Sequence, residues 1–370
     1  MVIIPLQARR RVLVTEGGSG QSRAAVAAVR ALSAEGYEPV VSVSGGRSMA
    51  AASRDCARRV RLPLADEAGY ADAVREELSR HPYLTVLPTS DSAIIALGAP
   101  GQDLLDKIRA ADRARAAGLP VPPSRVFSSL DEVMAARGGF EYPVVVKPAI
   151  KKYSASRIDA PDELPGVLAE EGPVIVQPYL SEQLHGVLGV AWEGSLVAAV
   201  HIRYLRIWPL PCGTVAAAET VTPDEDLEGR LTSLLGGYQG IFHVDLAGPY
   251  VLDVNPRVHA TLPLAVVAGA NLVSLYCDLL RGRRVPTVRG RSGHFFRWIE
   301  GDVRSVIRSV RNGHVGLGPA LQALRPRRGA VHGYESLRDP GPLFARFRYL
   351  PSRLRRGPTL RTLASTSRGT

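Results

Sequence analysis

Two aspartates in the stretch from residue 241 to residue 261, IFHVDLAGPYVLDVNPRVHAT, have the spacing of a metal site. Apolar runs flank the turn signal Ala-Gly-Pro at 247–249, which is typical of a β-hairpin. With the turn there, Asp245 falls opposite Asp253, and Asn255 shares the face of Asp253 because strand side chains alternate. Facing carboxylates repel each other, and a divalent cation between them removes the conflict. The hairpin therefore predicts a Mg²⁺ site, with Mn²⁺ as an alternative ion, formed by Asp245, Asp253 and Asn255.

Arg257 follows the second predicted strand of this hairpin. Its planar guanidinium can bind two oxygens of a phosphate or carboxylate at once, so we interpret it as a catalytic cation. His259 and Thr261 come soon enough afterwards to line an acceptor pocket. The alternative for the whole stretch is an ordinary hairpin whose aspartates point at water.

Another cation ends a buried strand in the sequence YPVVVKP at residues 142–148. Lys147 stands after three valines and before Pro148, which cannot continue a strand ladder. An ammonium at the mouth of an apolar strand needs an anionic partner, and phosphate oxygens suit it. The chain holds only four lysines, at positions 107, 147, 151 and 152, so each lysine is a candidate for a specific role.

Further candidates lie near predicted strand ends. Arg203 and Arg206 precede a loop rich in proline and could bind a substrate carboxylate or phosphate, although a surface arginine pair is the general alternative. Residues 89–92 follow a predicted strand at 84–87, so they could contact a ligand or cap the next helix. We do not interpret Cys212 as a nucleophile, because no histidine stands near it in the sequence.

The composition indicates a soluble globular protein, with 45% hydrophobic residues and a mean hydropathy of +0.01. A length of 370 residues suffices for two or three domains. The sequence has no apolar run long enough to span a membrane and no signal-peptide pattern at its start. Three widely separated cysteines argue against disulfides and for a reducing compartment, so we expect a cytoplasmic protein.

The net charge of +11 is concentrated toward the C-terminus. Residues 281–370 contain 20 arginines and four acidic residues, a net charge of +16, which leaves −5 for residues 1–280. The segment 302–311, DVRSVIRSVR, predicts an amphipathic helix. Its predicted apolar face consists of Val303, Val306, Ile307 and Val310, with Arg304, Arg308 and Arg311 opposite. This face can pack on the core, or the helix can contact an anionic membrane or an acidic partner, whereas no nucleic-acid-binding signature occurs.

Four segments, in this order, resemble the ATP-grasp ligases. They are DLLDKIRAADRARAAGLPVPPS at 103–124, YPVVVKP at 142–148, VIVQPYL at 174–180 and D-x7-D-x-N-P-R at 245–257. The resemblance covers roughly residues 10–285 and is closest to ATP-grasp proteins related to the large subunit of carbamoyl phosphate synthetase. It implies an α/β and α+β fold, with a Rossmann-like parallel α/β domain at 1–100 and a two-lobed ATP-grasp domain at 101–285. The small lid lobe would span about 120–180, and a basic helical extension with a mobile tail would occupy 286–370.

The resemblance also implies roles for the basic residues. Lys107 matches the first nucleotide-binding basic residue of the family, with a solvated helix lysine as the alternative. Lys147 matches the lysine that contacts the α- and β-phosphates of ATP. Arg203 and Arg206 fall where a substrate carboxylate or the γ-phosphate would bind.

The adenine of ATP would bind at the segment that resembles the hinge between the two lobes. Gln177 would face the adenine edge, and Tyr179 would lie within the hinge. The carbonyl of Pro178 would accept a hydrogen bond from the exocyclic amine, and the N–H of Leu180 would donate to the ring. Glu182 would bind the ribose.

The sequence departs from the family pattern at several positions. Aspartates stand where the family usually has glutamate, and Gln177 stands where many members have glutamate. The predicted lid loop, AIKKYSASR at 149–157, has no glycine, whereas many members have a glycine-rich turn there. Its possible donors are Lys151, Lys152, Ser154 and Ser156.

The activity implied by the resemblance is an ATP- and Mg²⁺-dependent ligation of small molecules. A carboxylate would be activated as an acyl phosphate and attacked by an amine or thiol, with release of ADP and phosphate. Arg257, Arg206 and Arg203 would be the catalytic residues. The alternative is a catalytically silent protein that binds Mg-ATP as a sensor or scaffold. The sequence does not predict the two substrates or the oligomeric state.

Overall fold

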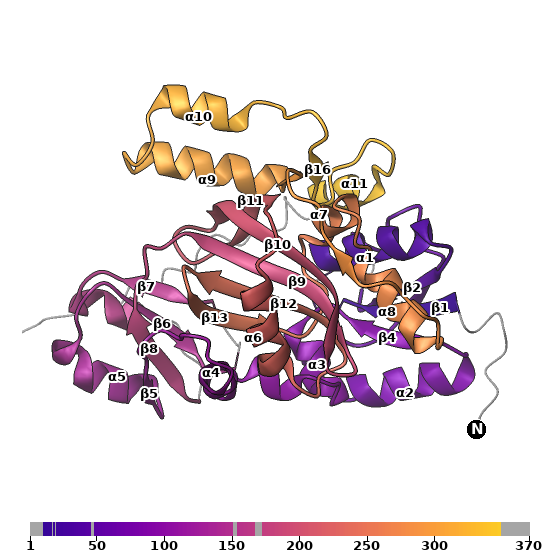
Figure 1. The fold of residues 1–370 in the computed structure, drawn as a ribbon, viewed down its shortest axis with the longest axis horizontal. Coiled ribbons are helices and arrows are strands. Elements are labelled where there is room, and N and C mark those ends of the chain that lie inside the picture. Colours follow the sequence, from indigo (N-terminus) through magenta and orange to yellow (C-terminus); the bar gives the residue numbers. More distant parts are fainter. Residues whose placement is uncertain are drawn as a thin grey trace, which may run out of the picture.

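The computed structural model describes residues 10–16, 18, 20–45, 48–150, 154–166 and 172–348. The described strands form three sheets, arranged as Figure 1 shows. Lys151, Lys152 and the predicted mobile tail lie outside the described residues. Among the helices of the described ranges, none is long and apolar enough to cross a membrane.

The first sheet is parallel, with the strand order β3-β2-β1-β4. Its strands are β1 (Arg11–Thr15), β2 (Glu38–Val43), β3 (Arg58–Arg61) and β4 (Thr85–Pro88). Helix α1 (Arg23–Ala34) packs on Val12 and Val14, while α2 (Tyr70–Arg80) and α3 (Asp91–Leu97) pack on the side of Leu13. Successive side chains of β1 point to opposite faces of the sheet, and the helices on its two sides bury both faces. The parallel α/β opening agrees with the prediction, and its classification as a Rossmann-like domain stays a prediction.

The second sheet is small and antiparallel, with the order β5-β8-β6-β7. Its strands are β5 (Arg125–Phe127), β6 (Val144–Pro148), β7 (Ser156–Ile158) and β8 (Val174–Pro178). Helix α5 (Leu130–Ala136) and the 3₁₀ helices η3 (Arg137–Gly139) and η4 (Pro161–Gly166) accompany these strands. Val144 and Val146 point into the core of this lobe. Alternation therefore directs Lys147 of β6 toward the opposite face of the small sheet.

The third sheet has eight strands in the order β13-β12-β9-β10-β11-β15-β16, with β14 beside β10. They are β9 (Leu184–Trp192), β10 (Ser195–Trp208), β11 (Thr214–Thr220), β12 (Gly240–Ala247), β13 (Tyr250–Asn255), β14 (Val288–Arg289), β15 (Phe295–Arg297) and β16 (Val331–His332). Helices α4 (Lys107–Ala116) and α6 (Glu225–Leu235) share one core with this sheet. Helices α7 (Leu262–Val267) and α8 (Leu272–Leu280) share another core that also contains α1 and β1. The large sheet and the N-terminal sheet are therefore joined by a common core.

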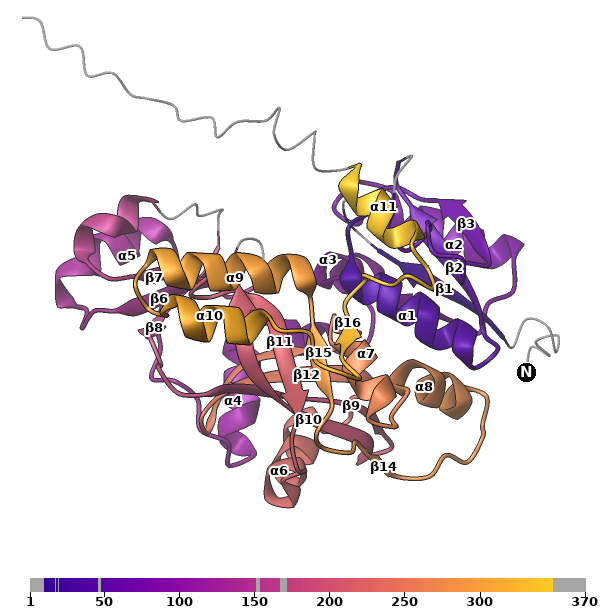
Figure 2. The same cartoon turned by 90° about the horizontal axis from the view of Figure 1, so that it is seen from above.

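The C-terminal segment completes the large sheet and returns to the N-terminal sheet. Strand β15 pairs with β11, and β16 pairs with β15. Helices α9 (Ile299–Arg311) and α10 (Leu317–Leu324) lie beyond β10 and β11, and α11 (Gly341–Phe347) lies near the N-terminal sheet (Figures 1 and 2). The carboxylate of Asp339 accepts hydrogen bonds from Arg30 Nε at 2.9 Å, the Ser53 hydroxyl at 2.6 Å and the Arg54 N–H at 3.0 Å. The predicted boundary between residues 285 and 286 stays a prediction, although the strands beyond it belong to the large sheet.

The segment from residue 102 to residue 116 forms two helical pieces. The 3₁₀ helix η2 (Gln102–Leu105) precedes α4, which begins at Lys107. The Asp106 carboxylate accepts a hydrogen bond from the Ile108 N–H at 2.9 Å, so it caps a new helix at this point. The cap places Lys107 in the first turn of α4.

The amphipathic helix predicted at 302–311 is present as α9, and its three arginines are exposed as predicted, but its predicted apolar face is only partly buried. Its buried residues are Gly301, Asp302, Ser305 and Val306, whereas Ile307 is 45% exposed. The reason is that the fully buried Asp302 forms ion pairs with Arg206 and Arg297. A buried charge must keep its partners, so the ion pairs determine the rotation of the helix more strongly than the apolar pattern does.

Candidate active site

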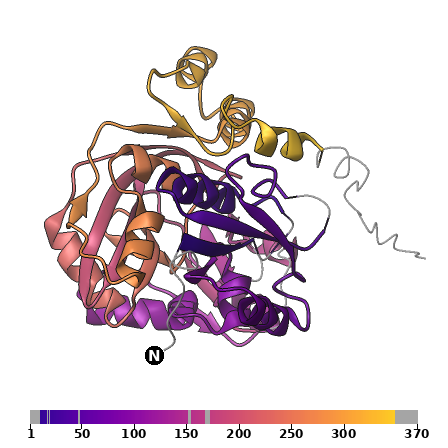
Figure 3. The same ribbon diagram turned by 90° about the vertical axis from the view of Figure 1, so that its right-hand side faces the viewer.

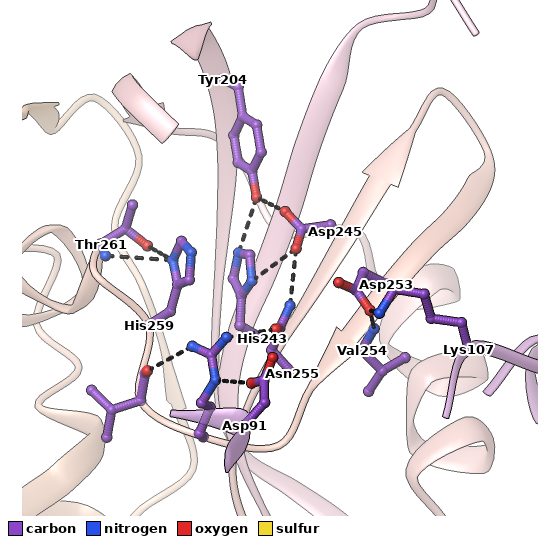
Figure 4. A network of polar contacts seen from close by, with 12 residues as sticks. Asp91, Lys107, Tyr204, His243, Asp245, Asp253, Val254, Asn255, His259 and Thr261 are labelled. Atoms are coloured by element: carbon purple, nitrogen blue, oxygen red, sulfur yellow. Dashed lines mark hydrogen bonds and ion pairs between the residues drawn. The ribbon is translucent and has the colours of Figure 1, made fainter. Parts of the chain in front are cut away.

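The two aspartates of the predicted metal site face each other across β12 and β13. The strands are antiparallel, and the register pairs Asp245 with Asp253, with a bulge directly after this pair. Both side chains are 27% exposed. Figure 4 shows their carboxylates on adjacent strands of the hairpin. The local sequence determines this pairing through its short turn and its alternating pattern.

Two lysines from different elements converge on Asp253. The Nζ atom of Lys107, in α4, lies 3.4 Å from Asp253 Oδ1. The Nζ atom of Lys147, at the end of β6, donates a hydrogen bond of 3.1 Å to the carbonyl of Leu252. Burial lowers the pKa of Lys147 to about 8, because an ammonium loses its hydration there, while the nearby Asp253 opposes the shift. Two cations this close together indicate a site for an anion with more than one charge.

A cavity of about 250 Å³ lies beside these lysines. The polar side chains around it include Lys107, Lys147, Gln177 and Asp253, and Ile175 and Val251 supply apolar surface. Gln177 is buried on β8 and shares its face of the small sheet with Ile175. The structure therefore brings four predicted site residues together from α4, β6, β8 and β13.

The rest of the predicted hinge follows β8 at the edge of this region. Pro178 is exposed at the end of the strand, and the N–H of Tyr179 donates to the Pro143 carbonyl at 3.0 Å. The guanidinium of Arg157 lies 4.3 Å from the centre of the Tyr179 ring. Leu180 is partly buried. The adenine-binding roles of Pro178, Tyr179 and Leu180 stay predictions.

Glu182, the predicted ribose ligand, is exposed and lies against the turn of the hairpin. A Cβ atom added to Gly248 would come within 3.0 Å of the Glu182 side chain. Gly248 has a positive φ of 51°, and its N–H donates to the Gln183 carbonyl at 3.0 Å. The hinge therefore packs against the β12–β13 turn, and glycine is required at this turn both for conformation and for space.

Asp245 belongs to a cluster of polar side chains that the sequence did not predict. The Tyr204 hydroxyl donates to Asp245, and His243 Nδ1 lies 3.4 Å from the same carboxylate (Figure 4). The rings of His243 and His259 are stacked with their centres 3.8 Å apart. Gly186 leaves room for the cluster, because a Cβ there would lie 2.7 Å from the Tyr204 hydroxyl. The position of His243 in this cluster could have been predicted from the sequence, because His243 stands two residues before Asp245 on the same strand and therefore shares its face.

The electrostatics of this cluster keep Asp245 ionised. Burial favours a higher pKa for Asp245, but the charge and hydrogen bond of His243 outweigh it, so the pKa lies well below the usual range. Burial lowers the pKa of His259 far below its ordinary value, and His243 adds to this effect. Burial and the neighbouring Asp245 raise the pKa of Tyr204. The result is an anionic Asp245 carboxylate in a cluster with a neutral His259 and a protonated Tyr204.

Asn255 connects the two ends of the predicted metal site. Its Nδ2 atom donates to Asp245 Oδ2 at 3.1 Å, and its Oδ1 atom accepts from Arg257 Nη2 at 3.0 Å. Its amide oxygen is therefore engaged by Arg257 in this structure, and its role as a metal ligand stays a prediction. Within the described ranges, no group of three or more His, Cys, Asp or Glu side chains is arranged to hold a metal ion. Two facing carboxylates still fit Mg²⁺, which commonly takes its other ligands from water and substrate phosphates.

Arg257 forms an ion pair with Asp91, the first residue of α3. Both side chains are nearly buried, at 12% and 11% exposure. The segment 89–92 therefore approaches the hairpin, and its contact with a ligand stays a prediction. The alternative interpretation as a helix cap is confirmed, because the Ser90 hydroxyl accepts from the Ala93 N–H at 3.2 Å and caps α3. The predicted acceptor residues His259 and Thr261 contact each other, with His259 Nδ1 2.8 Å from Thr261 Oγ1.

The other two predicted catalytic arginines have acidic partners away from the hairpin. Arg203 pairs with Glu219 of β11 and is half exposed. Arg206 pairs with the buried Asp302 of α9. Arg203 therefore fits the alternative interpretation as a surface arginine, whereas Arg206, at 20% exposure, does not. Their catalytic roles stay predictions.

The sequence and the fold of the chain were compared with those of known proteins. No protein-family model matches the sequence. The chain is 30% identical over 243 residues to a formate-dependent phosphoribosylglycinamide formyltransferase of Stutzerimonas stutzeri (strain A1501), covering 59% of this chain and 58% of that protein. It is 25% identical over 292 residues to the arginine-specific large chain of carbamoyl phosphate synthase of Geobacillus stearothermophilus, covering 70% of this chain and 27% of that protein. The chain thus spans less than two thirds of the length of these curated relatives.

Solved structures share the fold at low sequence identity. An L-amino acid ligase from Bacillus licheniformis has a TM-score of 0.57 and 17% identity, covering 74% of both chains. The biotin carboxylase domain of the Hydrogenobacter thermophilus 2-oxoglutarate carboxylase, in complex with MgADP, has a TM-score of 0.57 and 13% identity, covering 77% of this chain and 73% of that one. The similarities in sequence and fold confirm the resemblance to the ATP-grasp ligases found from the four segments.

Proposed function

We propose that the protein is an ATP-dependent ligase that activates a carboxylate as an acyl phosphate for attack by an amine, releasing ADP and phosphate. The observation that supports this best is the convergence of Lys107 and Lys147 on Asp253, beside a cavity lined by Gln177. The names of the relatives, which include a formyltransferase, a synthase and a ligase, are consistent with this chemistry.

The triphosphate would bind where the two ammonium groups meet. Lys107 and Lys147 carry like charges in a partly dehydrated place, and polyphosphate oxygens would satisfy both. Asp245 and Asp253 would hold Mg²⁺, which when bound neutralises phosphate charge. Lys107 supplies positive charge next to Asp253. Gln177 would face the adenine from the floor of the cavity.

The carboxylate substrate would approach from the side of Arg257. This residue lies between Asn255 of the hairpin and Asp91 of α3, so it connects the phosphate side of the site to the N-terminal sheet. Catalysis would consist of alignment of the carboxylate with the γ-phosphate and neutralisation of the charge that develops there. The identities of the carboxylate and the amine are not part of the proposal.

A second candidate function is a sensor or scaffold that binds Mg-ATP without turnover. The specific observation in its favour is that all three predicted catalytic arginines are paired with carboxylates, namely Asp91, Glu219 and Asp302. A cation that is already neutralised stabilises a transition state less than a free one.

The decisive experiment measures ADP release and Mg-ATP binding together, with mixed pools of carboxylic acids and amines as substrates. A ligase releases ADP with at least one pool, and Asp253→Asn abolishes this release. The matched control is Asp226→Asn, on the exposed surface of α6, which should leave release unchanged. Binding of Mg-ATP without release from any pool supports the sensor. Absence of Mg-ATP binding overturns both candidates.

A further inference from the structure

Helix α10 turns its apolar stripe away from the protein. Leu317 and Leu321, one turn apart, are 72% and 69% exposed, whereas the neighbouring Ala320 is buried. A surface helix normally buries such a stripe against the core. Exposed clusters of large apolar side chains mark contact surfaces.

Helix α9 presents a similar combination next to it. The buried ion pairs of Asp302 set the rotation of this helix and leave Ile307 45% exposed. The exposed arginines of the helix are Arg304, Arg308 and Arg311. Apolar and cationic side chains therefore occur side by side on the outer surface of α9.

Helix α11 also exposes large apolar side chains, since Phe344 and Phe347 are 62% and 55% exposed. Figures 1 and 2 place α9, α10 and α11 on one side of the molecule, and Figure 3 shows α10 as the outermost element there. Of the ten large apolar side chains exposed in the described part of the chain, seven belong to residues 299–347. We call the surface formed by these three helices the C-terminal face.

The charge of this region indicates what it can bind. Residues 281–348 contain 15 arginines and four acidic residues. Of these acids, Glu300, Asp302 and Asp339 form ion pairs with described arginines. Residues 349–370 contain five arginines and no acidic residue, so they repeat the charge of the face and do not complement it. The complementary partner is anionic and accepts apolar side chains.

We propose that the C-terminal face binds the surface of an anionic membrane peripherally. Isoleucine, leucine and phenylalanine side chains on three helices at one side of the molecule can enter the boundary between headgroups and acyl chains, while the surrounding arginines contact lipid phosphates. An acidic protein partner is disfavoured, because these side chains project from three separate helices and are spread along the whole side of the molecule. The proposal does not depend on the ligase activity.

Vesicle flotation tests the proposal with the full-length chain. Phosphatidylcholine vesicles containing phosphatidylglycerol should bind at least about tenfold more protein than pure phosphatidylcholine vesicles, and salt should weaken this binding. The variant with Leu317→Gln and Leu321→Gln should bind about tenfold less, as should the variant with Arg308→Gln and Arg311→Gln. The matched controls are Val126→Gln, which is 51% exposed in β5, and the pair Arg75→Gln and Arg230→Gln, on α2 and α6. These controls should retain wild-type binding.

Three results would overturn the proposal. The first is equal binding of the wild type to neutral and anionic vesicles. The second is absence of vesicle binding together with retention on polyglutamate, which would assign the face to an acidic protein. The third is absence of vesicle binding together with a dimer that Leu317→Gln and Leu321→Gln dissociate, which would assign it to a second copy of the chain. Thermal unfolding of each variant separates these outcomes from misfolding.

Discussion

Asp91 and Arg257 form a nearly buried ion pair across 166 residues of sequence, and this pair connects α3 of the N-terminal sheet to the β12–β13 hairpin. The same guanidinium donates to Asn255, which in turn donates to Asp245. A displacement of α3 would therefore be transmitted through three polar contacts to the predicted metal site. Substrate bound near α3 and nucleotide bound near the hairpin would share this connection.

The first prediction concerns Arg257→Lys. Lysine keeps the charge but cannot hold Asp91 and Asn255 with one planar group. We expect Mg-ATP affinity to stay within a few-fold and kcat to fall about a hundredfold or more, as for loss of one preorganised transition-state contact. Calorimetry gives the affinity, and ADP release at saturating ATP gives kcat. An equal loss in both quantities would place Arg257 in nucleotide binding.

The second prediction is a pH dependence of nucleotide affinity. Burial lowers the pKa of Lys147 to about 8. Its ammonium is charged at lower pH and becomes neutral as the pH rises through this value, so phosphate binding should weaken with rising pH. Between pH 7 and pH 9 the affinity should fall about tenfold, because one protonated form binds. Lys147→Arg should flatten the profile, and a wild-type affinity that is constant over this range would contradict the assignment.

The third prediction compares the buried ion pairs of Asp302 with the more exposed ion pair of Glu219 in their effect on the free energy of unfolding. Asp302→Asn leaves Arg206 and Arg297 with an uncompensated charge, so the free energy of unfolding should fall by about 3–5 kcal/mol. Glu219→Gln removes the partner of the half-exposed Arg203 and should cost less than about 1 kcal/mol. Urea unfolding measures both. Similar losses in the two variants would show that the ion pairs of Asp302 are no more important than a surface pair.

The fourth prediction concerns Glu16, which is 4% exposed after β1 and has no hydrogen-bond partner at Oε1 among the described residues. Burial raises its pKa from 4.5 to about 7, against opposing hydrogen bonds from Ser48 and Ala50. The unfolded chain loses this proton near pH 4.5, whereas the folded protein keeps it until about pH 7. Stability therefore decreases as the pH rises between these values, by about 3 kcal/mol in total.

Glu16→Gln cannot lose a proton, so its stability relative to the wild type should be higher at pH 8 than at pH 4 by up to this amount. Urea unfolding at the two pH values measures the difference. The control is Glu35→Gln on the exposed end of α1, for which the difference should be small. A difference near zero for Glu16→Gln would show that Glu16 is ionised in the folded protein.

Local features of the site were predictable from the sequence, and long-range ones were not. The Asp245–Asp253 register follows from a short turn and alternating strands, and Lys147 and Gln177 stand at the ends of strands that their own sequences define. The partners of Arg206 and Arg257 come from elements 96 and 166 residues away. Periodicity carries no information about such pairs, and this is why the exposure of Ile307 on α9 was not predicted.

The hydrogen bonds of Asp339 also impose an order on biosynthesis. Its partner Arg30 is 309 residues closer to the N-terminus, and Ser53 and the Arg54 N–H depend on the same carboxylate. At roughly 5–20 residues per second, a ribosome needs roughly 15–60 s to synthesise the intervening chain. The nascent N-terminal sheet must remain folded, or protected, for that time with these donors exposed to water. Its maturation ends only when Asp339 has been synthesised.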